Sequence, residues 1–191
     1  MNKRTVALTD QQYIDIITVI KGGFCLAGRE YQPNERIATA LTLEANLGVR
    51  ISDILKLHYC DIVKDGDRFR LDIVEIKTGK ARTFTVPTEI RSFIDQYRIN
   101  NHKGEQQRLF DLSERQIQKH LKAACDYLGL SGISTHSFRK YFATQIYINN
   151  DYNIELVRQL LQHSSAAVTQ RYIGIQQKQI EKALQNHIKL I

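Results

Sequence analysis

Cysteine is scarce in this 191-residue sequence, and long apolar runs are missing from it. The three cysteines, Cys25, Cys60 and Cys125, are far apart and odd in number. They fit neither a disulfide framework nor a zinc cluster, and so favour a reducing, intracellular setting. No apolar run approaches the roughly 18 residues that a membrane span needs. The first residues lack an apolar core followed by a small-residue cleavage site, so we expect no secretory signal. These absences predict a cytoplasmic globular protein with no membrane partner.

Acidic residues are outnumbered by basic ones. The chain holds 27 Lys and Arg against 20 Asp and Glu, a formal net charge of +7 with a pI near 9.3. Most of the excess lies after residue 100. A basic balance is typical of proteins with a polyanionic partner such as nucleic acid, although a basic domain without such a partner fits the charge equally well.

Hydrophobic periodicity predicts a mainly α domain that carries a small antiparallel β-hairpin. Residues 68–77 and 81–87 alternate apolar and polar positions around the turn at 78–80. No repeat, low-complexity segment or Pro/Gly/Ser linker divides the chain, so we expect a single domain over residues 1–191. Helical spacing, with capping residues at several starts, predicts helices over 9–23, 34–48, 50–59, 88–101, 113–129, 134–150, 153–165, 165–174 and 176–190.

His136 and Arg139 lie three residues apart near a predicted helix start. Residues at this spacing share a helix face, and a helix N-terminus also offers free N–H groups to an anion. Taken alone, such a pair is more often part of a solvated helix face.

The predicted hairpin carries Lys77, Lys80 and Arg82 at its tip. Hairpin tips are often basic simply because they are exposed to water. A functional interpretation requires one lysine to project toward a site built elsewhere, where its pKa would respond to charge and burial and allow it to act as an acid.

Three further positions are ambiguous when taken singly. Arg50 comes shortly after Gly48, at a predicted helix start, and Asp53 lies one helical turn further on. The two form either a local ion pair or a carboxylate-oriented guanidinium that grips a phosphate. His163 lies where one predicted helix ends and the next begins. Tyr172 follows it by nine residues, and a lone tyrosine there is more often a packing residue than a nucleophile.

The order and spacing of these segments are more informative than any one of them. Along the chain come "GVRISDIL", "IKTGK", "THSFRKYFAT", "LLQHSS" and "QRYI". Together they resemble the catalytic domain of the tyrosine recombinases, the phage and transposon integrase family. The resemblance covers residues 9–176 and leaves 177–191 as a C-terminal helix. It implies the tyrosine recombinase (DNA breaking-rejoining enzyme) catalytic-domain fold.

The resemblance also implies a site and a reaction, namely DNA cleavage and rejoining through a 3′-phosphotyrosyl link. Two guanidiniums would neutralise the charge that develops on the phosphate, and the tyrosine phenol, whose pKa is about 10, would need a base. His136 is the candidate base. The resemblance matches Arg50, His136, Arg139 and His163 to the groups around the scissile phosphate, Lys77 to the general acid on the 5′ oxygen, Tyr172 to the nucleophile and Asp53 to a supporting carboxylate.

We expect no metal or other cofactor, because no acidic triad, Walker loop or clustered His and Cys ligands argue for one. The implied partner is double-stranded DNA, and the family self-associates on DNA as a tetrameric synapse. Additional DNA-binding candidates are Lys80, Arg82, Lys140 and Arg171.

The sequence departs from the family pattern at Gln162, where a glycine usually precedes the second histidine, and at Lys140, where histidine is common. We also expect the family's N-terminal DNA-clamping (core-binding) domain to be absent from this chain. The segment 176–190 places apolar residues on one helical face and either packs on its own domain or docks on a neighbouring subunit. Those residues are Ile180, Ala183 or Leu184, and Ile188.

Two alternatives stay open beside a site-specific recombinase. One is a type IB topoisomerase, which shares the phosphotyrosine chemistry. The other is a catalytically idle DNA-binding remnant or regulator of the same fold. The complete set of six candidate catalytic residues argues against decay, whereas the expected absence of the N-terminal domain leaves the second alternative open.

Overall fold

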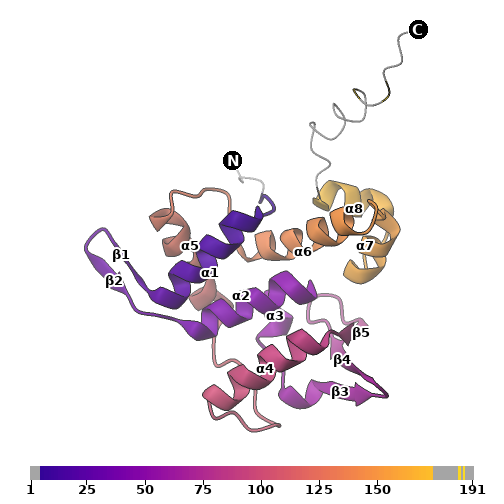
Figure 1. The fold of residues 1–191 in the computed structure, drawn as a ribbon, viewed down its shortest axis with the longest axis horizontal. Helices are drawn as coiled ribbons and strands as arrows, with labels where there is room; N and C mark the ends of the chain where they lie inside the picture. Colours follow the sequence, from indigo (N-terminus) through magenta and orange to yellow (C-terminus); the bar gives the residue numbers. More distant parts are fainter. Residues whose placement is uncertain (1–4, 174–184, 186, 188–191) are drawn as a thin grey trace. The chain divides into compact units, whose positions relative to one another are not determined.

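The computed structural model describes residues 5–173 together with 185 and 187 (Figure 1). The chain divides into two compact units, Met1–Phe142 and Ala143–Ile191. The predicted C-terminal helix over 176–190, including Ile180, Ala183, Leu184 and Ile188, falls outside the described residues except for 185 and 187.

The described elements confirm a mainly helical fold with small antiparallel sheets. Unit Met1–Phe142 holds α1 (Asp10–Gly22), β1 (Phe24–Leu26), β2 (Arg29–Tyr31), α2 (Glu35–Leu47), α3 (Ile51–Ile54), the 3-10 turn η1 (Tyr59–Asp61), β3 (Ile62–Asp65), β4 (Arg68–Val74), β5 (Ala81–Val86), α4 (Thr88–Asn100) and α5 (Glu114–Tyr127). Helix α6 (Thr135–Asn149) begins in this unit and ends in the next. Unit Ala143–Ile191 continues with α7 (Ile154–Leu161) and α8 (Ala166–Ile173).

The predicted hairpin exists as β4 and β5, but it belongs to a three-stranded antiparallel sheet of order β3-β4-β5. Strand β4 ends at Val74, so residues 75–80 form the connection to β5 rather than parts of the strands. Neither β3 nor the separate β1–β2 hairpin was predicted from the sequence. Strands of three or four residues offer too few positions for a two-residue alternation to be recognised.

The helix predicted over 50–59 is shorter than expected and ends at Ile54. The carbonyl oxygen of Leu57 accepts a hydrogen bond from the Leu109 N–H at 2.9 Å, and His58 forms an antiparallel bridge with Arg108. Because this backbone pairs with a distant segment, it cannot continue the helix. The predicted apolar stripe is nevertheless buried, as expected: Ile51, Ile54, Leu55 and Leu57.

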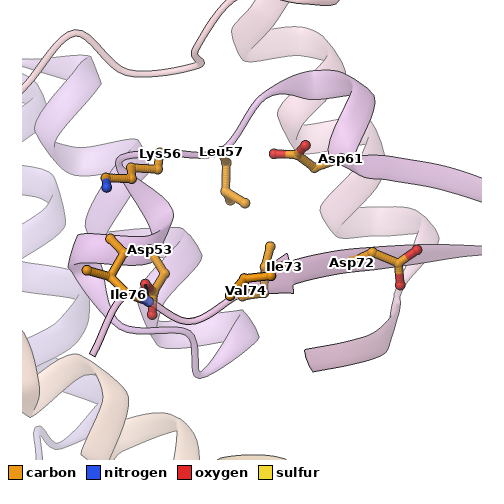
Figure 2. Close-up of a pocket in the computed structure, with 8 residues that line it drawn as sticks. All are labelled: Asp53, Lys56, Leu57, Asp61, Asp72, Ile73, Val74 and Ile76. Carbon is orange, nitrogen blue, oxygen red and sulfur yellow. Dashed lines mark hydrogen bonds between the residues drawn. The ribbon is translucent and has the colours of Figure 1, made fainter. Parts of the chain in front are cut away.

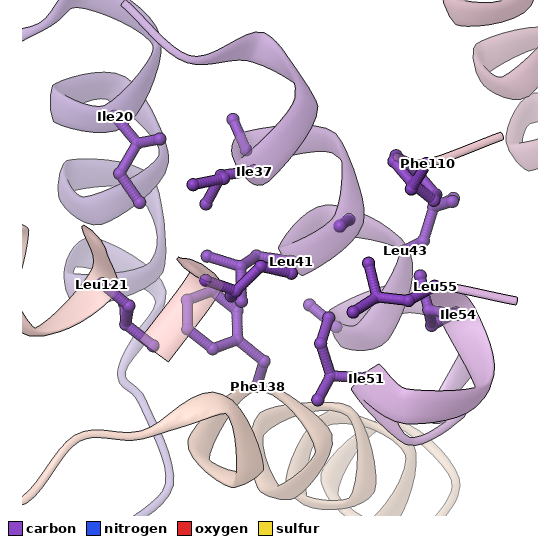
Figure 3. Close-up of a cluster of buried hydrophobic side chains, with 14 of the residues drawn as sticks. Ile20, Ile37, Leu41, Leu43, Ile51, Ile54, Leu55, Phe110, Leu121 and Phe138 are labelled. Atoms are coloured by element: carbon purple, nitrogen blue, oxygen red, sulfur yellow. The ribbon is translucent and has the colours of Figure 1, made fainter. Parts of the chain in front are cut away.

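Helix α2 is buried along most of its length and forms the axis of the first unit. It packs against α1, α3 and α4. Figure 3 shows Leu41 of α2 among side chains from α1, α5 and α6, which include Ile20, Leu121 and Phe138. Leu43 lies on the side of α2 that faces Phe110 and Ile54. A close-packed helix of this kind holds its ends in place, so the chain that leaves α2 starts from a rigid point.

Helix starts follow the capping signals of the sequence. Thr9 and Ser113 both form capping boxes, with Gln12 and Gln116 respectively. Among the residues that the structure describes, no helix combines the length and the apolar character that crossing a membrane requires.

Candidate active site

Gly48 ends α2 and forms the centre of the site in the first unit. Its φ of 59° is left-handed, and a Cβ built there would lie 2.3 Å from Cδ1 of Phe142. Only glycine fits this position, because other residues meet both the φ penalty and the ring. The Gly48 carbonyl oxygen accepts from Nη1 of Arg139 at 2.7 Å and from Nη1 of Arg82 at 3.5 Å. Both α6 and β5 therefore contact the end of α2 at Gly48, two residues before Arg50.

Arg139 is buried, with 2 % of its surface exposed. It lies in the first turns of α6, next to the buried Phe138. The negative end of the α2 dipole, at the Gly48 carbonyl, complements its charge. Burial and this short hydrogen bond hold the guanidinium in one orientation.

Arg50 sits at the start of α3 and forms an ion pair with Glu75. Its Nη1 lies 2.6 Å from Oε2 of Glu75, whose side chain is 1 % exposed, while that of Arg50 is 19 % exposed. Sequence reasoning missed Glu75. The only signal was the break in the strand alternation at this residue, which marks the end of β4.

Asp53 is buried and ties α3 to the connection between β4 and β5. Its Oδ1 accepts from the Ile76 N–H at 2.9 Å. Within residues 5–173, the ion pair of Arg50 is made with Glu75 and not with Asp53. Figure 2 shows Asp53 beside Ile76 at the edge of a pocket of about 170 Å³. The pocket is lined by Asp53, Lys56, Leu57, Asp61, Asp72, Ile73, Val74 and Ile76.

Lys77 and Lys80 are exposed on the β4–β5 connection, as predicted for a hairpin tip. The backbone there is closed by two hydrogen bonds. The Gly79 N–H donates to the Glu75 carbonyl at 2.8 Å, and the Glu75 N–H donates to the Lys80 carbonyl at 3.0 Å. Lys77 therefore lies on a short, internally bonded turn.

The expectation that Arg82 is exposed at the hairpin tip is wrong. Its side chain is 3 % exposed, and its guanidinium carbon lies 4.6 Å from the centroid of the Phe84 ring. Burial, aided by the nearby charge of Arg139, lowers the pKa of Arg82 to about 10. The residue occupies an inward position in the alternation of β5.

His136 is on the exposed side of the first turn of α6. Desolvation, followed by the positive charges of Arg139, Lys77 and Arg50, holds the pKa of His136 below its ordinary 6.5. The ring is therefore neutral near pH 7 and able to accept a proton. Arg50, Lys77, His136 and Arg139 all belong to the first unit.

The second unit holds His163 at a tight helix end. Helix α7 stops at Leu161, four residues before the predicted end, because Gln162 adopts a left-handed φ of 55°. The His163 N–H donates to the Arg158 carbonyl at 3.0 Å, and Nη1 of Arg158 donates to the His163 carbonyl at 3.0 Å. These bonds, with that from the Gln162 N–H to Gln159, close the helix in the pattern of a Schellman motif.

His163 and Tyr172 lie together within this second unit. Their ring centroids are 5.1 Å apart, with the planes at 77°. Nδ1 of His163 lies 3.1 Å from Oγ1 of Thr169, a fully buried residue of α8. Helix α8 thus places both the nucleophile candidate and the hydroxyl that orients the histidine.

The two remaining DNA-binding candidates differ in exposure. Arg171 is exposed on α8, and its Nε donates to the Ala167 carbonyl at 3.4 Å. Lys140 is half-buried, and its Nζ donates to the Thr5 carbonyl at 2.7 Å. Over the part of the chain that the structure describes, no three His, Cys, Asp or Glu side chains are placed to hold a metal ion.

Known proteins with similar sequences are integrases and recombinases. The model of the phage integrase family matches residues 7–179. The probable integrase/recombinase YoeC of Bacillus subtilis (strain 168) is 34 % identical over 137 residues, which cover 68 % of this chain and 72 % of YoeC. The tyrosine recombinase XerC of Caldanaerobacter subterraneus subsp. tengcongensis is 26 % identical over 161 residues, 78 % of this chain and 44 % of XerC.

Solved structures show the same fold at lower identity. The catalytic domain of bacteriophage HP1 integrase aligns with a TM-score of 0.65 at 18 % identity, over 96 % of each chain. XerA recombinase aligns with a TM-score of 0.70 at 19 % identity, over 98 % of this chain and 67 % of XerA. XerH recombinase in a post-cleavage complex aligns with a TM-score of 0.68 at 18 % identity, over 96 % of this chain and 53 % of XerH.

The chain therefore spans about half the length of XerH and less than half of XerC, and it corresponds in extent to the HP1 catalytic domain. The family match covers most of the sequence, and YoeC matches over more than two thirds of its own length. This chain belongs to the phage integrase family and has the catalytic-domain fold of the tyrosine recombinases.

Proposed function

We propose that this chain is a site-specific recombinase catalytic domain that cleaves and rejoins DNA, with Tyr172 as the nucleophile. The observation that carries the proposal is the grouping of Arg139, which donates to the Gly48 carbonyl, with Arg50, which pairs with Glu75 two residues before Lys77. A phosphodiester under attack gains negative charge on its non-bridging oxygens. Preorganised guanidiniums beside a proton acceptor are the groups that stabilise this charge and activate an attacking hydroxyl.

In the proposed reaction, Oη of Tyr172 attacks the scissile phosphorus and the bond from phosphorus to the 5′ oxygen breaks. The phenol proton passes to His136, and the ammonium group of Lys77 gives a proton to the departing 5′ oxygen. The products are a 3′-phosphotyrosyl link and a free 5′ hydroxyl. A second 5′ hydroxyl reverses the step on a new strand, so no external energy source is needed.

The remaining side chains bind and orient the phosphate. Arg50 and Arg139 would contact its non-bridging oxygens in the planar, two-pronged geometry that guanidiniums favour. His163 would contact the phosphate through its ring, which the contact between Nδ1 and Oγ1 of Thr169 orients. Asp53 supports this set through its bond to the backbone of the Lys77 turn.

The proposed partner is double-stranded DNA. XerH was solved bound to its difH substrate, and the λ integrase and the Tn1549 integrase were also solved with DNA. The net charge of +7 suits such a partner. We propose Lys80 and Arg171, which are exposed, as contacts to the backbone, and self-association of this chain on DNA as a tetramer.

We further propose that residues 1–191 function as one catalytic domain, with a core over 9–176. The alignment over 96 % of both this chain and the HP1 catalytic domain supports this extent. The second candidate function, DNA binding without catalysis, is disfavoured because all six catalytic positions hold functional side chains.

The proposal can be tested with a duplex that carries the recombination site of this protein and a nick close to the scissile phosphate. Cleavage then releases a short strand that bears the free 5′ hydroxyl. Once this strand diffuses away, the phosphotyrosyl link cannot be resealed and the covalent intermediate is trapped. We expect an adduct with the wild-type chain and none with Tyr172→Phe, which keeps the ring but lacks the nucleophile. Both proteins should bind the duplex equally in a gel-shift assay.

An equal adduct yield from Tyr172→Phe would disprove the assignment of the nucleophile. Binding without any adduct from the wild type would instead favour the idle DNA-binding alternative. Relaxation of supercoiled plasmid that lacks the site would favour topoisomerase activity.

A further inference from the structure

We propose that Glu75 is a positioning residue that holds the Arg50 guanidinium and the Lys77 turn in a single arrangement. This inference rests on the proposed function, since it concerns how two residues of that reaction are placed. Neither the motif segments nor the candidate set from the sequence contains Glu75. The fold brings it beside Arg50 from 25 residues away.

One carboxylate oxygen of Glu75 contacts both groups that it would position. Oε2 lies 2.6 Å from Nη1 of Arg50 and accepts from Oγ1 of Thr78 at 2.9 Å. The other oxygen, Oε1, lies 3.6 Å from Nη1 of the buried Arg82. Thr78 directly follows Lys77, so the same oxygen bridges from the arginine to the turn that carries the lysine.

The backbone of Glu75 closes that turn as well. Its N–H donates to the Lys80 carbonyl and its carbonyl accepts from the Gly79 N–H. The neighbouring Ile76 N–H donates to Oδ1 of Asp53. Main chain and side chain at this one position therefore set both ends of the connection over 75–80.

Burial makes the position of Glu75 rigid. The side chain is 1 % exposed, and burial acts to raise its pKa, but hydrogen bonds from Arg50 and Thr78 bring the pKa below the ordinary value of 4.5. The carboxylate is thus charged at neutral pH. It lies among the positive charges of Arg50, Arg82 and Arg139 and reduces their mutual repulsion.

A buried ion pair of this kind is weak evidence for a role in stability, because apolar residues of similar volume often serve as well. The role of the ion pair is instead to orient the Arg50 guanidinium. Glu75 is buried and engages Nη1 of Arg50, whose side chain is partly exposed, so the other N–H groups of the guanidinium would be left for a phosphate. Displacement of a reacting group by about 1 Å can cost about 100-fold in rate.

Two modified substrates separate positioning from general destabilisation. A methylphosphonate at the scissile position is neutral and relieves the need for a guanidinium. A 5′-bridging phosphorothiolate has a sulfur leaving group and relieves the need for an acid. Cleavage rates of Glu75→Ala and Glu75→Gln would be measured on both and on the natural diester, beside the reference variants Arg50→Ala and Lys77→Ala.

We expect Glu75→Ala to cleave the natural diester about 100-fold more slowly than wild type. It should regain part of this loss on each modified substrate, because it misplaces both groups. Arg50→Ala should regain cleavage rate mainly on the methylphosphonate, and Lys77→Ala should regain it mainly on the phosphorothiolate. The control Val86→Ala, which removes buried apolar atoms from β5 in the same sheet, should show the wild-type ratio of rates on all three substrates.

Equal slowing of Glu75→Ala on all three substrates would overturn the inference, as would no slowing at all. Glu75→Gln keeps the volume and decides the test if Glu75→Ala does not fold. If the reference variants show no substrate-specific response, the assignment of Arg50 and Lys77 fails instead, which is a failure of the proposed function and not of the inference about Glu75.

Discussion

Glu44 is an ionisable residue in the interior of the first unit, one turn before the end of α2. It is fully buried. Its Oε1 accepts from the Ile51 N–H at 3.2 Å, while Oε2 has no hydrogen-bond partner among the described residues. Burial raises the pKa of Glu44 well above its ordinary 4.5, and the charge of Arg139 only partly opposes this. The folded state therefore favours the protonated acid.

Replacing Glu44 with glutamine should stabilise the protein increasingly as the pH rises above 4.5. A raised pKa means that the folded state holds a proton that the unfolded state has lost. The stability of the wild type is therefore present below 4.5 and declines as the pH rises through the folded-state pKa. Glutamine keeps the carbonyl oxygen for Ile51 and carries no charge. Urea unfolding at several pH values measures the difference, and equal curves for Glu44→Gln and wild type from pH 4 to 8 would contradict it.

At Gly48 the fold restricts which residue type can be accommodated. Gly48→Ala should destabilise the protein by roughly 2–5 kcal/mol, because the left-handed φ costs about 1–2 kcal/mol and overpacking against Phe142 costs about 1–3 kcal/mol more. Gly129→Ala is a matched control at the end of α5, where φ is 68° and a Cβ meets nothing within 4 Å. It should lose only the φ contribution. Similar losses in chemical denaturation of the two variants would contradict the overpacking argument.

At the scale of elements, the end of α7 accounts for a departure from the family pattern. Gln162 stands where glycine usually precedes the second histidine, and its φ is 55°. Gln162 thus adopts the left-handed backbone conformation that usually favours glycine. Two helix-closing hydrogen bonds and the bond from Arg158 to the His163 carbonyl hold it there.

Gln162→Gly should therefore stabilise the protein by up to about 1 kcal/mol, since relief of the left-handed strain exceeds the added freedom of the unfolded chain. The same substitution three residues earlier, Gln159→Gly, lies within α7 and should cost about 1 kcal/mol. Melting temperatures of the two variants should move in opposite directions. A lower melting temperature for Gln162→Gly would show that the Gln162 side chain contributes more than its backbone strain costs.

At the scale of the whole molecule, the excess of basic residues should govern DNA affinity. Each phosphate that a protein contacts releases counterions, so affinity falls steeply between about 50 and 200 mM salt. Lys80→Gln should reduce the slope of log affinity against log salt concentration by about 1. Lys122→Gln is a control, because Nζ of Lys122 is already paired with Asp126 at 2.7 Å on α5. Equal slopes for Lys80→Gln and wild type would remove Lys80 from the proposed contacts.

Much of the fold was predictable because its signals are local. Thr9, Asn34 and Ser113 cap helices in the expected places, since each side chain bonds to a backbone N–H three residues on. The long helices followed from apolar spacing within one segment. Short elements were missed or overextended where a distant segment decided them, as when Leu109 pairs with Leu57 and ends α3.

The sequence by itself determined the candidate chemistry: the order of Arg50, Lys77, His136, Arg139, His163 and Tyr172 along the chain indicated the family and the reaction. Only the tertiary structure decided which basic side chains face inward and which acid meets which arginine. Arg82 is buried, and Glu75 pairs with Arg50 from 25 residues away. Gly48 accepts from Arg139 across 91 residues. Such pairs depend on how helices and strands pack, because side chains so far apart in sequence meet only when the core between them has formed.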